Sequence, residues 1–271
     1  MIKSPKIVFF DIDGTLYSMA TNRIPPSALD ALRQLREKGI LVFLATGRHR
    51  SQIESLPQFQ GLEYDGGVTL NGGYCYDESG VIFHNPICRE DLQGLLAHLE
   101  AEPTPCGFIE EDRSYVNFYN DWVYRVHEMI HTPLLPLEDL RRGLEKPVYQ
   151  VLLYLKPEDD DTLPFMPTCR STRWHTGGLD IIPSWGGKAL GIEKVLEHYG
   201  ISKEETVAFG DGENDLDMFE AVGFSVAMGN AVPTLQKAAD LVTEAVDADG
   251  IAKALLSLGL IEPRKDDDNA L

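Results

Sequence analysis

Two carboxylates stand two residues apart directly after an apolar run near the N-terminus. The run Lys6-Ile-Val-Phe-Phe leads into Asp11 and Asp13, and a glycine turn follows at once. A short continuous apolar run is typical of a buried strand of a parallel sheet, and ligands of open α/β sheets bind at the carboxyl ends of such strands. Because buried carboxylates are costly without a cation or hydrogen-bond donors, we expect these two to take part in chemistry.

Two further apolar runs, at residues 40–45 and 206–210, are also predicted to be buried strands. In a doubly wound sheet the carboxyl ends of such strands meet at one edge, so the polar residues after each run are expected near Asp11 and Asp13. These residues are Thr46, Gly47, Asp211, Asn214 and Asp215.

Three of these carboxylates form a candidate metal site. Asp11, Asp13 and Asp211 could supply hard oxygen ligands. Mg²⁺ favours one or two carboxylates together with water and substrate phosphate. These three carboxylates could therefore hold Mg²⁺ together with the phosphate of a substrate.

A phosphate group at this edge needs donors and positive charge. Thr46 offers a hydroxyl and Gly47 an unobstructed N–H. Lys188, at the start of a predicted helix directly after the loop 184–187, is the candidate cation. Metal and lysine matter here because the formal net charge of the chain is -19, which would otherwise disfavour an anionic substrate.

The composition excludes several classes of protein. The net charge of -19 leaves no cationic footprint for nucleic acid or a membrane surface. No apolar run approaches a membrane span, and the N-terminal run is too short for a signal segment. The four cysteines show no Cys-x-x-Cys pairing, which favours reduced thiols. We therefore expect a cytoplasmic protein that is a monomer or a weak homo-oligomer.

Strands and helices alternate along both ends of the chain, which predicts an α/β fold with a doubly wound parallel sheet. We assign residues 1–83 and 184–271 to this core, and residues 84–183 to an inserted domain. The alternating segment Tyr115–Tyr119 indicates an antiparallel sheet in the insertion. In the core, Ser27 and Asp30 are predicted to cap the first helix.

The chain resembles the haloacid dehalogenase-like superfamily, and within it the Cof-type sugar phosphatases. The resemblance covers nearly the whole chain, with only small departures such as Gly73, where alanine is commoner. The four superfamily motifs stand in order at residues 11–15, 46–48, 188 and 210–215. The subgroup markers are Asn71-Gly72-Gly73, Leu179-Asp-Ile-Ile182 and Val226-Ala-Met-Gly-Asn-Ala231. The resemblance implies a Rossmann-like core, an inserted α/β cap that determines specificity, and a Mg²⁺-dependent phosphatase.

The resemblance also implies a two-step mechanism. Asp11 would attack phosphorus and form an aspartyl phosphate. Asp13 would protonate the leaving group and then deprotonate the attacking water, while its backbone carbonyl helps to ligate Mg²⁺. Asp211 would bind the metal directly. The substrate would be a small phosphorylated metabolite, and we expect a hexose or pentose phosphate.

Further residues receive supporting roles from the same resemblance. They include contacts to the phosphoryl group and residues that orient the lysine or anchor the loop behind the nucleophile. The phosphate contacts are Thr46, Gly47, Lys188 and Asn214, and the supporting residues are Thr15, Arg48 and Asp215. For Arg48, a pairing with acidic residues at the site and a purely structural salt bridge are both open.

The specificity residues of the cap are less defined. Glu111, Trp174 and His175 are candidates because carboxylates and aromatic rings hold sugars. Trp174 could instead pack in the cap core, and the acidic loop 110–112 could be solvated. We interpret Asn71-Gly72-Gly73 as a turn rather than a ligand.

Two other functions use the same residues. A phosphotransferase or phosphomutase would pass the phosphoryl group from Asp11 to a second sugar. A non-catalytic sensor would bind the metabolite without turnover, but the intact Asp13, Lys188 and Asp211 disfavour it.

Overall fold

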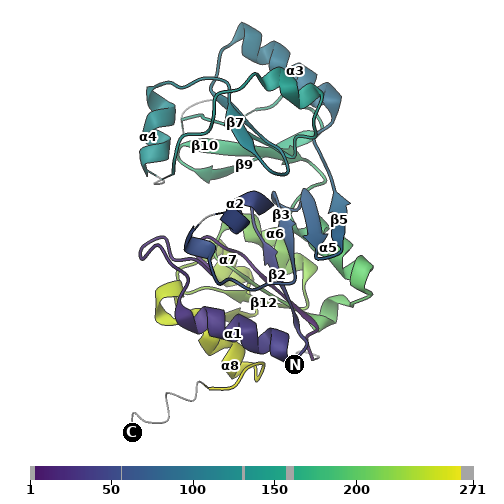
Figure 1. Cartoon of the computed structure of the whole chain (residues 1–271), viewed down its shortest axis with the longest axis vertical. Helices are drawn as coiled ribbons and strands as arrows, with labels where there is room; N and C mark the ends of the chain where they lie inside the picture. Colours follow the sequence, from purple (N-terminus) through teal and green to yellow (C-terminus); the bar gives the residue numbers. More distant parts are fainter. Residues whose placement is uncertain (1–3, 56, 130–131, 157–161, 264–271) are drawn as a thin grey trace.

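The apolar run after Lys6 forms the central strand β1 (Ile7–Phe10) of a large sheet. All four side chains of β1 are buried, as a strand covered on both faces requires. The computed structural model describes residues 4–55, 57–129, 132–156 and 162–263, without side-chain positions at residues 55, 58 and 173–175. Figure 1 shows two lobes, with this sheet in the lower one.

The sheet of the lower lobe has eight strands in the order β13-β12-β11-β1-β2-β3-β4-β5. The strands from β13 to β3 are parallel, and β4 and β5 extend the sheet as antiparallel strands. The other strands are β2 (Leu41–Ala45), β3 (Gly66–Thr69), β4 (Tyr74–Asp77), β5 (Gly80–His84), β11 (Thr206–Gly210), β12 (Phe224–Ala227) and β13 (Leu241–Val242).

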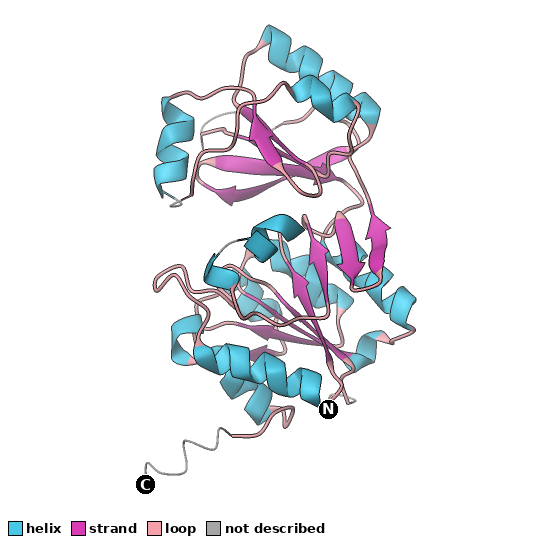
Figure 2. Ribbon diagram, viewed as in Figure 1, coloured by secondary structure: helices cyan, strands magenta, loops and turns pink. Residues whose placement is uncertain are grey.

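Helices cover both faces of this sheet (Figures 1 and 2). Helix α1 packs against α8, and α5 packs against α6 on the opposite face. The helices of this lobe are α1 (Pro26–Glu37), α2 (Arg50–Ser55), α5 (Lys188–Tyr199), α6 (Leu216–Ala221), α7 (Pro233–Ala238) and α8 (Gly250–Ser257). The prediction of a doubly wound α/β core is therefore confirmed.

The upper lobe is built on a second, antiparallel sheet in the order β7-β6-β8-β10-β9. Helices α3 (Arg89–Ala101) and α4 (Asp121–Met129) belong to this lobe (Figure 1). Its strands are β6 (Cys106–Ile109), β7 (Ser114–Val116), β8 (Gln150–Leu153), β9 (Cys169–His175) and β10 (Gly178–Pro183). The antiparallel inserted cap is confirmed, whereas its exact limits at residues 84 and 183 stay a prediction.

The predicted cap of the first helix is wrong. Helix α1 begins at Pro26 with Pro25 as its N-cap, and no side chain caps it. A proline at the first helical position has no N–H to satisfy and fixes a helical φ, so the helix begins before Ser27. Ser27 instead hydrogen-bonds Asp249, and Asp30 accepts from Arg33 and Gln34.

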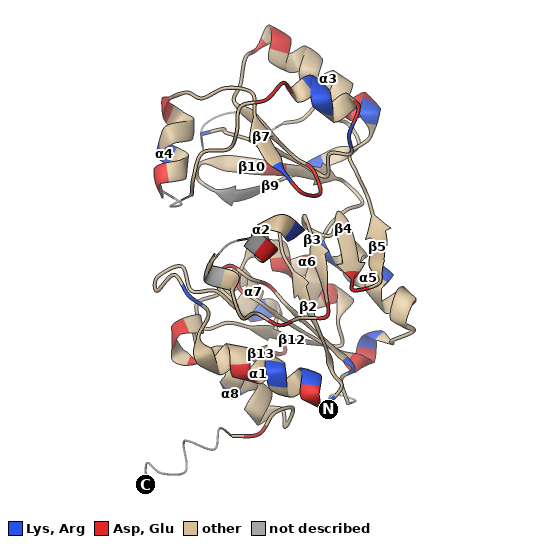
Figure 3. Ribbon diagram, viewed as in Figure 1, with Lys and Arg blue, Asp and Glu red and all other residues tan. Residues whose placement is uncertain are grey.

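Acidic and basic side chains follow one another along α1 (Figure 3). Arg33 pairs with both Asp30 and Glu37 on this helix.

None of the helices in the described part of the chain combines the length and the apolar character that a membrane span requires.

Candidate active site

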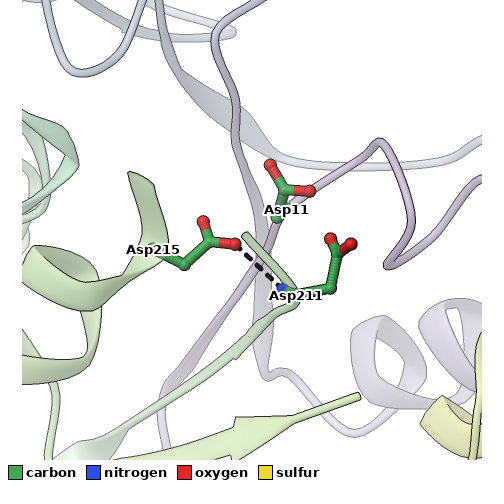
Figure 4. A group of neighbouring side chains, drawn as sticks. All are labelled: Asp11, Asp211 and Asp215. Atoms are coloured by element: carbon green, nitrogen blue, oxygen red, sulfur yellow. Dashed lines mark hydrogen bonds between the residues drawn. The ribbon is translucent and has the colours of Figure 1, made fainter. Parts of the chain in front are cut away.

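The strand ends that carry the predicted site residues meet at one edge of the eight-stranded sheet. Asp11 follows β1, which lies between β2 and β11. Thr46 follows β2 and Asp211 follows β11. One carboxylate oxygen each of Asp11, Asp211 and Asp215 lies within 4.8 Å of the others, and Figure 4 shows these side chains turned toward a common space.

Lys188 is the buried cation of this cluster. It is the first residue of α5, and only 1% of it is exposed. Its Nζ donates to Asp11 Oδ1 and to Asp215 Oδ1, both at 2.6 Å. Burial opposes the charge, but the two carboxylates prevail and raise the pKa of Lys188. The lysine is therefore held as an ammonium beside Asp11.

Asp215 organises the loop after β11. Its Oδ2 accepts hydrogen bonds from the backbone N–H groups of Asp211 and Gly212, both at 2.9 Å. Its Oδ1 accepts from Lys188. Both oxygens are thus occupied, so Asp215 positions the lysine and the Asp211 loop, and is a poor candidate for a metal ligand although it belongs to the acidic cluster.

Asp11 and Asp211 lie close together in this cluster although their negative charges repel each other. Burial raises the pKa of Asp11 well above its usual range, and the neighbouring aspartates add to this effect against Lys188. Burial and Asp215 raise the pKa of Asp211 to about 7. The Asp211 side chain is anchored by Thr15, whose hydroxyl donates to Oδ1 at 2.9 Å. Thr15 thus holds Asp211, and its predicted role of anchoring the loop behind Asp11 stays a prediction.

The acidic cluster fits a divalent cation by its charge. When ionised, Asp11, Asp211 and Asp215 carry three negative charges, and Lys188, which bridges Asp11 and Asp215, supplies one positive charge. Arg48 is paired with Asp13 outside this cluster, so a net negative charge remains on the three described carboxylates. Carboxylate oxygens are the ligands that hard divalent cations prefer. Asp11 and Asp211 could therefore hold such a cation.

Asp13 is paired differently from the other aspartates. Arg48 Nε donates to Asp13 Oδ2 at 2.7 Å, and a second guanidinium nitrogen donates to Oδ1 at 2.8 Å. The Asp13 carboxylate is 38% exposed and lies outside the cluster of Asp11, Asp211 and Asp215. Of the two readings left open for Arg48, the structure shows pairing with a site aspartate. The predicted contact of Asp13 with metal would have to come from its backbone carbonyl.

Of the four expected phosphate contacts, Lys188 and Asn214 line the cavity at this edge of the sheet, whereas Thr46 and Gly47 are not among its described lining residues. Thr46 is buried, and its Oγ1 accepts the N–H of Arg48 at 3.2 Å, which leaves the hydroxyl proton available for an anion. Asn214 lies exposed on the loop after β11, and its side chain lies over Gly212. Asn214 and Lys188 both line one cavity, but no hydrogen bond between these two described residues is present.

A cavity of about 590 Å³ lies between the core and the cap, above this cluster. The core contributes Asp11, Asp13 and Lys188 to its lining, and the cap contributes Arg170, Thr172 and Asp180. None of these three cap residues was predicted from the sequence to belong to the site. A signal was present for Asp180, because an acid within the apolar strand Leu179-Asp-Ile-Ile182 lies on the opposite face from Leu179 and Ile181.

Of the predicted cap candidates whose side chains are described, Glu111 does not line this cavity. Glu111 accepts a hydrogen bond from Tyr74 of the core, and Asp112 O accepts one from Ser51 Oγ at 3.0 Å. Glu110 is buried and paired with Arg142. The acidic loop is therefore a contact between cap and core. Trp174 and His175 lie in β9, and their side chains lie outside the described part of the chain.

Comparisons with known proteins cover both lobes. Residues 8–255 match the family model of haloacid dehalogenase-like hydrolases. YkrA of Bacillus subtilis, assigned provisionally as a phosphatase, is 37% identical over 95% of this chain and 99% of its own. The phosphoglycolate phosphatase of Archaeoglobus fulgidus is 31% identical over 95% and 98%.

Solved structures agree with these matches. BT1666 from Bacteroides thetaiotaomicron, studied among phosphatases of this superfamily, has a TM-score of 0.87 and 31% identity over 95% of this chain and 96% of its own. BT4131, a sugar phosphatase of subclass IIB, has a TM-score of 0.82 and 36% identity over 94% and 100%. Each match extends over nearly the whole chain and so includes both sheets.

Proposed function

Because this chain belongs to the haloacid dehalogenase-like hydrolase family, we propose that it is a Mg²⁺-dependent phosphatase of small phosphorylated metabolites, above all of sugar phosphates. Relatives that match nearly its whole length are named as phosphatases, which supports hydrolysis of phosphate monoesters as the reaction. The sugar phosphatase BT4131, at 36% identity, supports the substrate class. The cytoplasmic location and the monomeric or weakly oligomeric state stay predictions.

One observation carries the proposal. A buried lysine bridges Asp11 and Asp215 at 2.6 Å on each side, and Asp211 lies beside them. An ion pair that only stabilised the fold could lie at the surface. A site for phosphoryl transfer instead needs an anionic nucleophile next to a fixed positive charge, away from water. The same edge of the sheet provides the hydroxyl of Thr46.

Asp11 is the proposed nucleophile. Lys188 holds its Oδ1, so the second oxygen is the one available to attack phosphorus. The new bond joins this oxygen to phosphorus, while the bond from phosphorus to the leaving oxygen breaks. Water then attacks the phosphorus of the aspartyl phosphate, which releases inorganic phosphate and restores the Asp11 carboxylate.

Asp13 is the proposed acid and base. It would give a proton to the leaving oxygen in the first step and take one from the attacking water in the second. In this structure, however, Arg48 binds both oxygens of Asp13. Substrate binding therefore has to loosen the Arg48 contact before Asp13 can reach the leaving oxygen as an acid.

Fixed donors would hold the transferred group. A lysine ammonium has three donors, and Lys188 uses two on Asp11 and Asp215, so its third proton can reach a phosphoryl oxygen. Thr46 and the Gly47 N–H supply neutral donors. Mg²⁺ held by Asp11, Asp211 and the backbone carbonyl of Asp13 would neutralise phosphate charge.

The test is phosphate release from a panel of hexose phosphates, pentose phosphates, nucleotides and p-nitrophenyl phosphate, in Mg²⁺ and in EDTA. We expect release from sugar phosphates that requires Mg²⁺ and is lost in Asp11→Asn. The variant Asp121→Asn, on the exposed start of α4, is the matched control and should retain activity.

Turnover by Asp11→Asn at a rate near that of the wild type would overturn the proposed nucleophile. Undiminished release in EDTA would overturn the metal requirement. Phosphate transfer to an added sugar without free phosphate would replace hydrolysis by the phosphotransferase reaction.

A further inference from the structure

An unpartnered acceptor lies in the wall of the active-site cavity. Asn71 follows β3, in the turn before β4, and is 8% exposed. It lines the cavity together with Asp11 and Lys188. Its Oδ1 is buried and has no hydrogen-bond partner within the described part of the chain. Buried polar atoms are nearly always satisfied in folded proteins, so an exception in a cavity wall indicates a ligand contact.

The partners of Asn71 settle which end of its amide is free. Nδ2 donates to Gln150 Oε1 at 3.1 Å and to Asp180 Oδ2 at 3.4 Å. Asp180 also accepts from the Gln150 side chain. Because the Gln150 nitrogen is used on Asp180, its Oε1 faces Asn71, and an amide oxygen only accepts hydrogen bonds. The Asn71 nitrogen must therefore face Gln150 Oε1, and the Asn71 carbonyl oxygen is the unpartnered atom. Asn71 is thus oriented by two cap strands, β8 and β10.

The backbone holds Asn71 against Thr46 and Gly47, two of the residues proposed to bind phosphate. Its N–H donates to Thr46 O at 3.0 Å. A Cβ at Gly47 would lie 3.2 Å from the Asn71 Nδ2 and 3.3 Å from its Oδ1, so the amide packs directly on that glycine. Asn71 has a φ of 51°, a left-handed conformation that asparagine tolerates better than most residues. The Oδ1 of Asn71 therefore lies between Gly47 of the core and the cap residues Gln150 and Asp180.

The cap end of the cavity has other polar groups near this acceptor. Burial raises the pKa of Asp180 to about 7. Arg170 donates to Gly186 O at 3.1 Å and lies beside Thr172. Asp180, Arg170 and Thr172 line the same cavity as Asp11, so the leaving group of a phosphate at Asp11 would meet them if it extended toward the cap. A leaving group with hydroxyls would find partners there, and a purely apolar one would not.

We propose that Asn71 is a specificity-determining residue whose Oδ1 accepts a hydrogen bond from a hydroxyl of the leaving group, with Gln150 and Asp180 as positioning residues. The favoured substrates are then phosphate monoesters of polyhydroxylated compounds, rather than alkyl or aryl phosphates. The inference rests on the proposed phosphatase function and assigns its substrate selectivity to a contact between core and cap. A site built to bond a hydroxyl rejects analogues that lack it, because its buried acceptor stays unpaired.

The test compares glucose 6-phosphate and ribose 5-phosphate with n-hexyl phosphate and p-nitrophenyl phosphate, in the wild type and in Asn71→Gly. Glycine removes the side chain and accepts the positive φ. We expect kcat/KM for the better sugar phosphate, divided by kcat/KM for n-hexyl phosphate, to fall about 10-fold in Asn71→Gly, as expected for one lost hydrogen bond. The control Asn120→Ala, at the start of α4, should leave this ratio unchanged.

Two results separate this inference from the proposed function. A wild-type enzyme that releases phosphate from none of the four compounds would contradict the function itself. An active wild type whose ratio is the same in folded Asn71→Gly would overturn the role of Asn71 alone. If circular dichroism shows that Asn71→Gly is unfolded, Asn71→Ser, which also lacks the carbonyl, gives the same comparison.

Discussion

Replacing Asp211 by asparagine should stabilise the metal-free protein and remove its response to metal. Asparagine has nearly the same shape as aspartate, and its carbonyl can still accept the hydrogen bond from Thr15 that holds Oδ1 at 2.9 Å. The change removes only the negative charge, which lies near Asp215 and Asp11. The variant therefore isolates the cost of holding this carboxylate in the site.

The pKa of Asp211 gives the size of the effect. Burial and Asp215 raise it from 3.8 to about 7. The difference is about 3 pKa units, and each unit corresponds to about 1.36 kcal/mol, so ionised Asp211 costs roughly 4 kcal/mol of stability. Because the pKa of Asp211 is higher in the folded protein than in the unfolded chain, its protonated form stabilises the fold. This stabilisation is fully present below about pH 4 and is lost as the pH rises through 7. Asp211→Asn should match the wild type near pH 4 and exceed it most at pH 8.

Urea unfolding at pH 4, 6 and 8 in EDTA, followed by thermal melts at pH 8 with added Mg²⁺, measures both effects. We expect the variant to be more stable than the wild type by up to about 4 kcal/mol at pH 8. Mg²⁺ should raise the melting temperature of the wild type, because it binds the folded state, and should raise that of Asp211→Asn much less. A variant that is less stable than the wild type at pH 8 in EDTA would contradict the predicted cost of ionised Asp211. Equal stabilisation of both proteins by Mg²⁺ would contradict its role in holding the metal.

Two further predictions concern the other buried charged groups, Lys188 and Asp180. Lys188→Ala leaves Asp11 and Asp215 without their buried partner, so urea unfolding should show a loss of about 3–5 kcal/mol; a loss below about 1 kcal/mol would contradict the ion pairs at 2.6 Å. Burial raises the pKa of Asp180 to about 7, so its contribution to stability is lost as the pH rises from about 4 through 7. Asp180→Asn should therefore flatten the pH dependence of the melting temperature over this interval, and parallel curves for the variant and the wild type would show that Asp180 does not titrate there.

The core of the site could be predicted because its residues follow buried strands directly. Asp11, Thr46 and Asp211 each come one residue after an apolar run, and parallel strands bring such positions to one edge. Lys188 is 177 residues from Asp11 in the chain. It was chosen as the cation because it starts a predicted helix after the loop 184–187, and the family motif includes it, but no spacing in the sequence could place it beside Asp11.

The cap side of the site could not be predicted in the same way. Asn71 was interpreted as a turn residue, and its positive φ confirms the turn. Its side chain nevertheless reaches the cavity, because β8 and β10 of the cap supply its partners Gln150 and Asp180. These contacts join residues 79 and 109 positions apart across two sheets, and no local pattern encodes them. The strands β3, β4, β5, β6 and β9 were likewise not predicted.

The acidic loop of the cap illustrates how burial decides between two readings. Glu110 and Glu111 could bind a sugar or face solvent, judged from the sequence. In the structure, Arg142 and Tyr115 bind Glu110 inside the cap, and Tyr74 binds Glu111 at the core. The partners come from distant segments, so the loop connects cap and core instead of lining the cavity.

The central claim is that Asp11 carries the phosphoryl group during turnover. Rapid acid quenching of the enzyme with a ³²P-labelled sugar phosphate that it hydrolyses, followed by peptide mass spectrometry, tests this claim directly. We expect an acid-stable, base-labile phosphate on Asp11 in the wild type and none in Asp11→Asn. Label on another residue, or steady turnover with no phosphorylated enzyme and continued activity of Asp11→Asn, would contradict it.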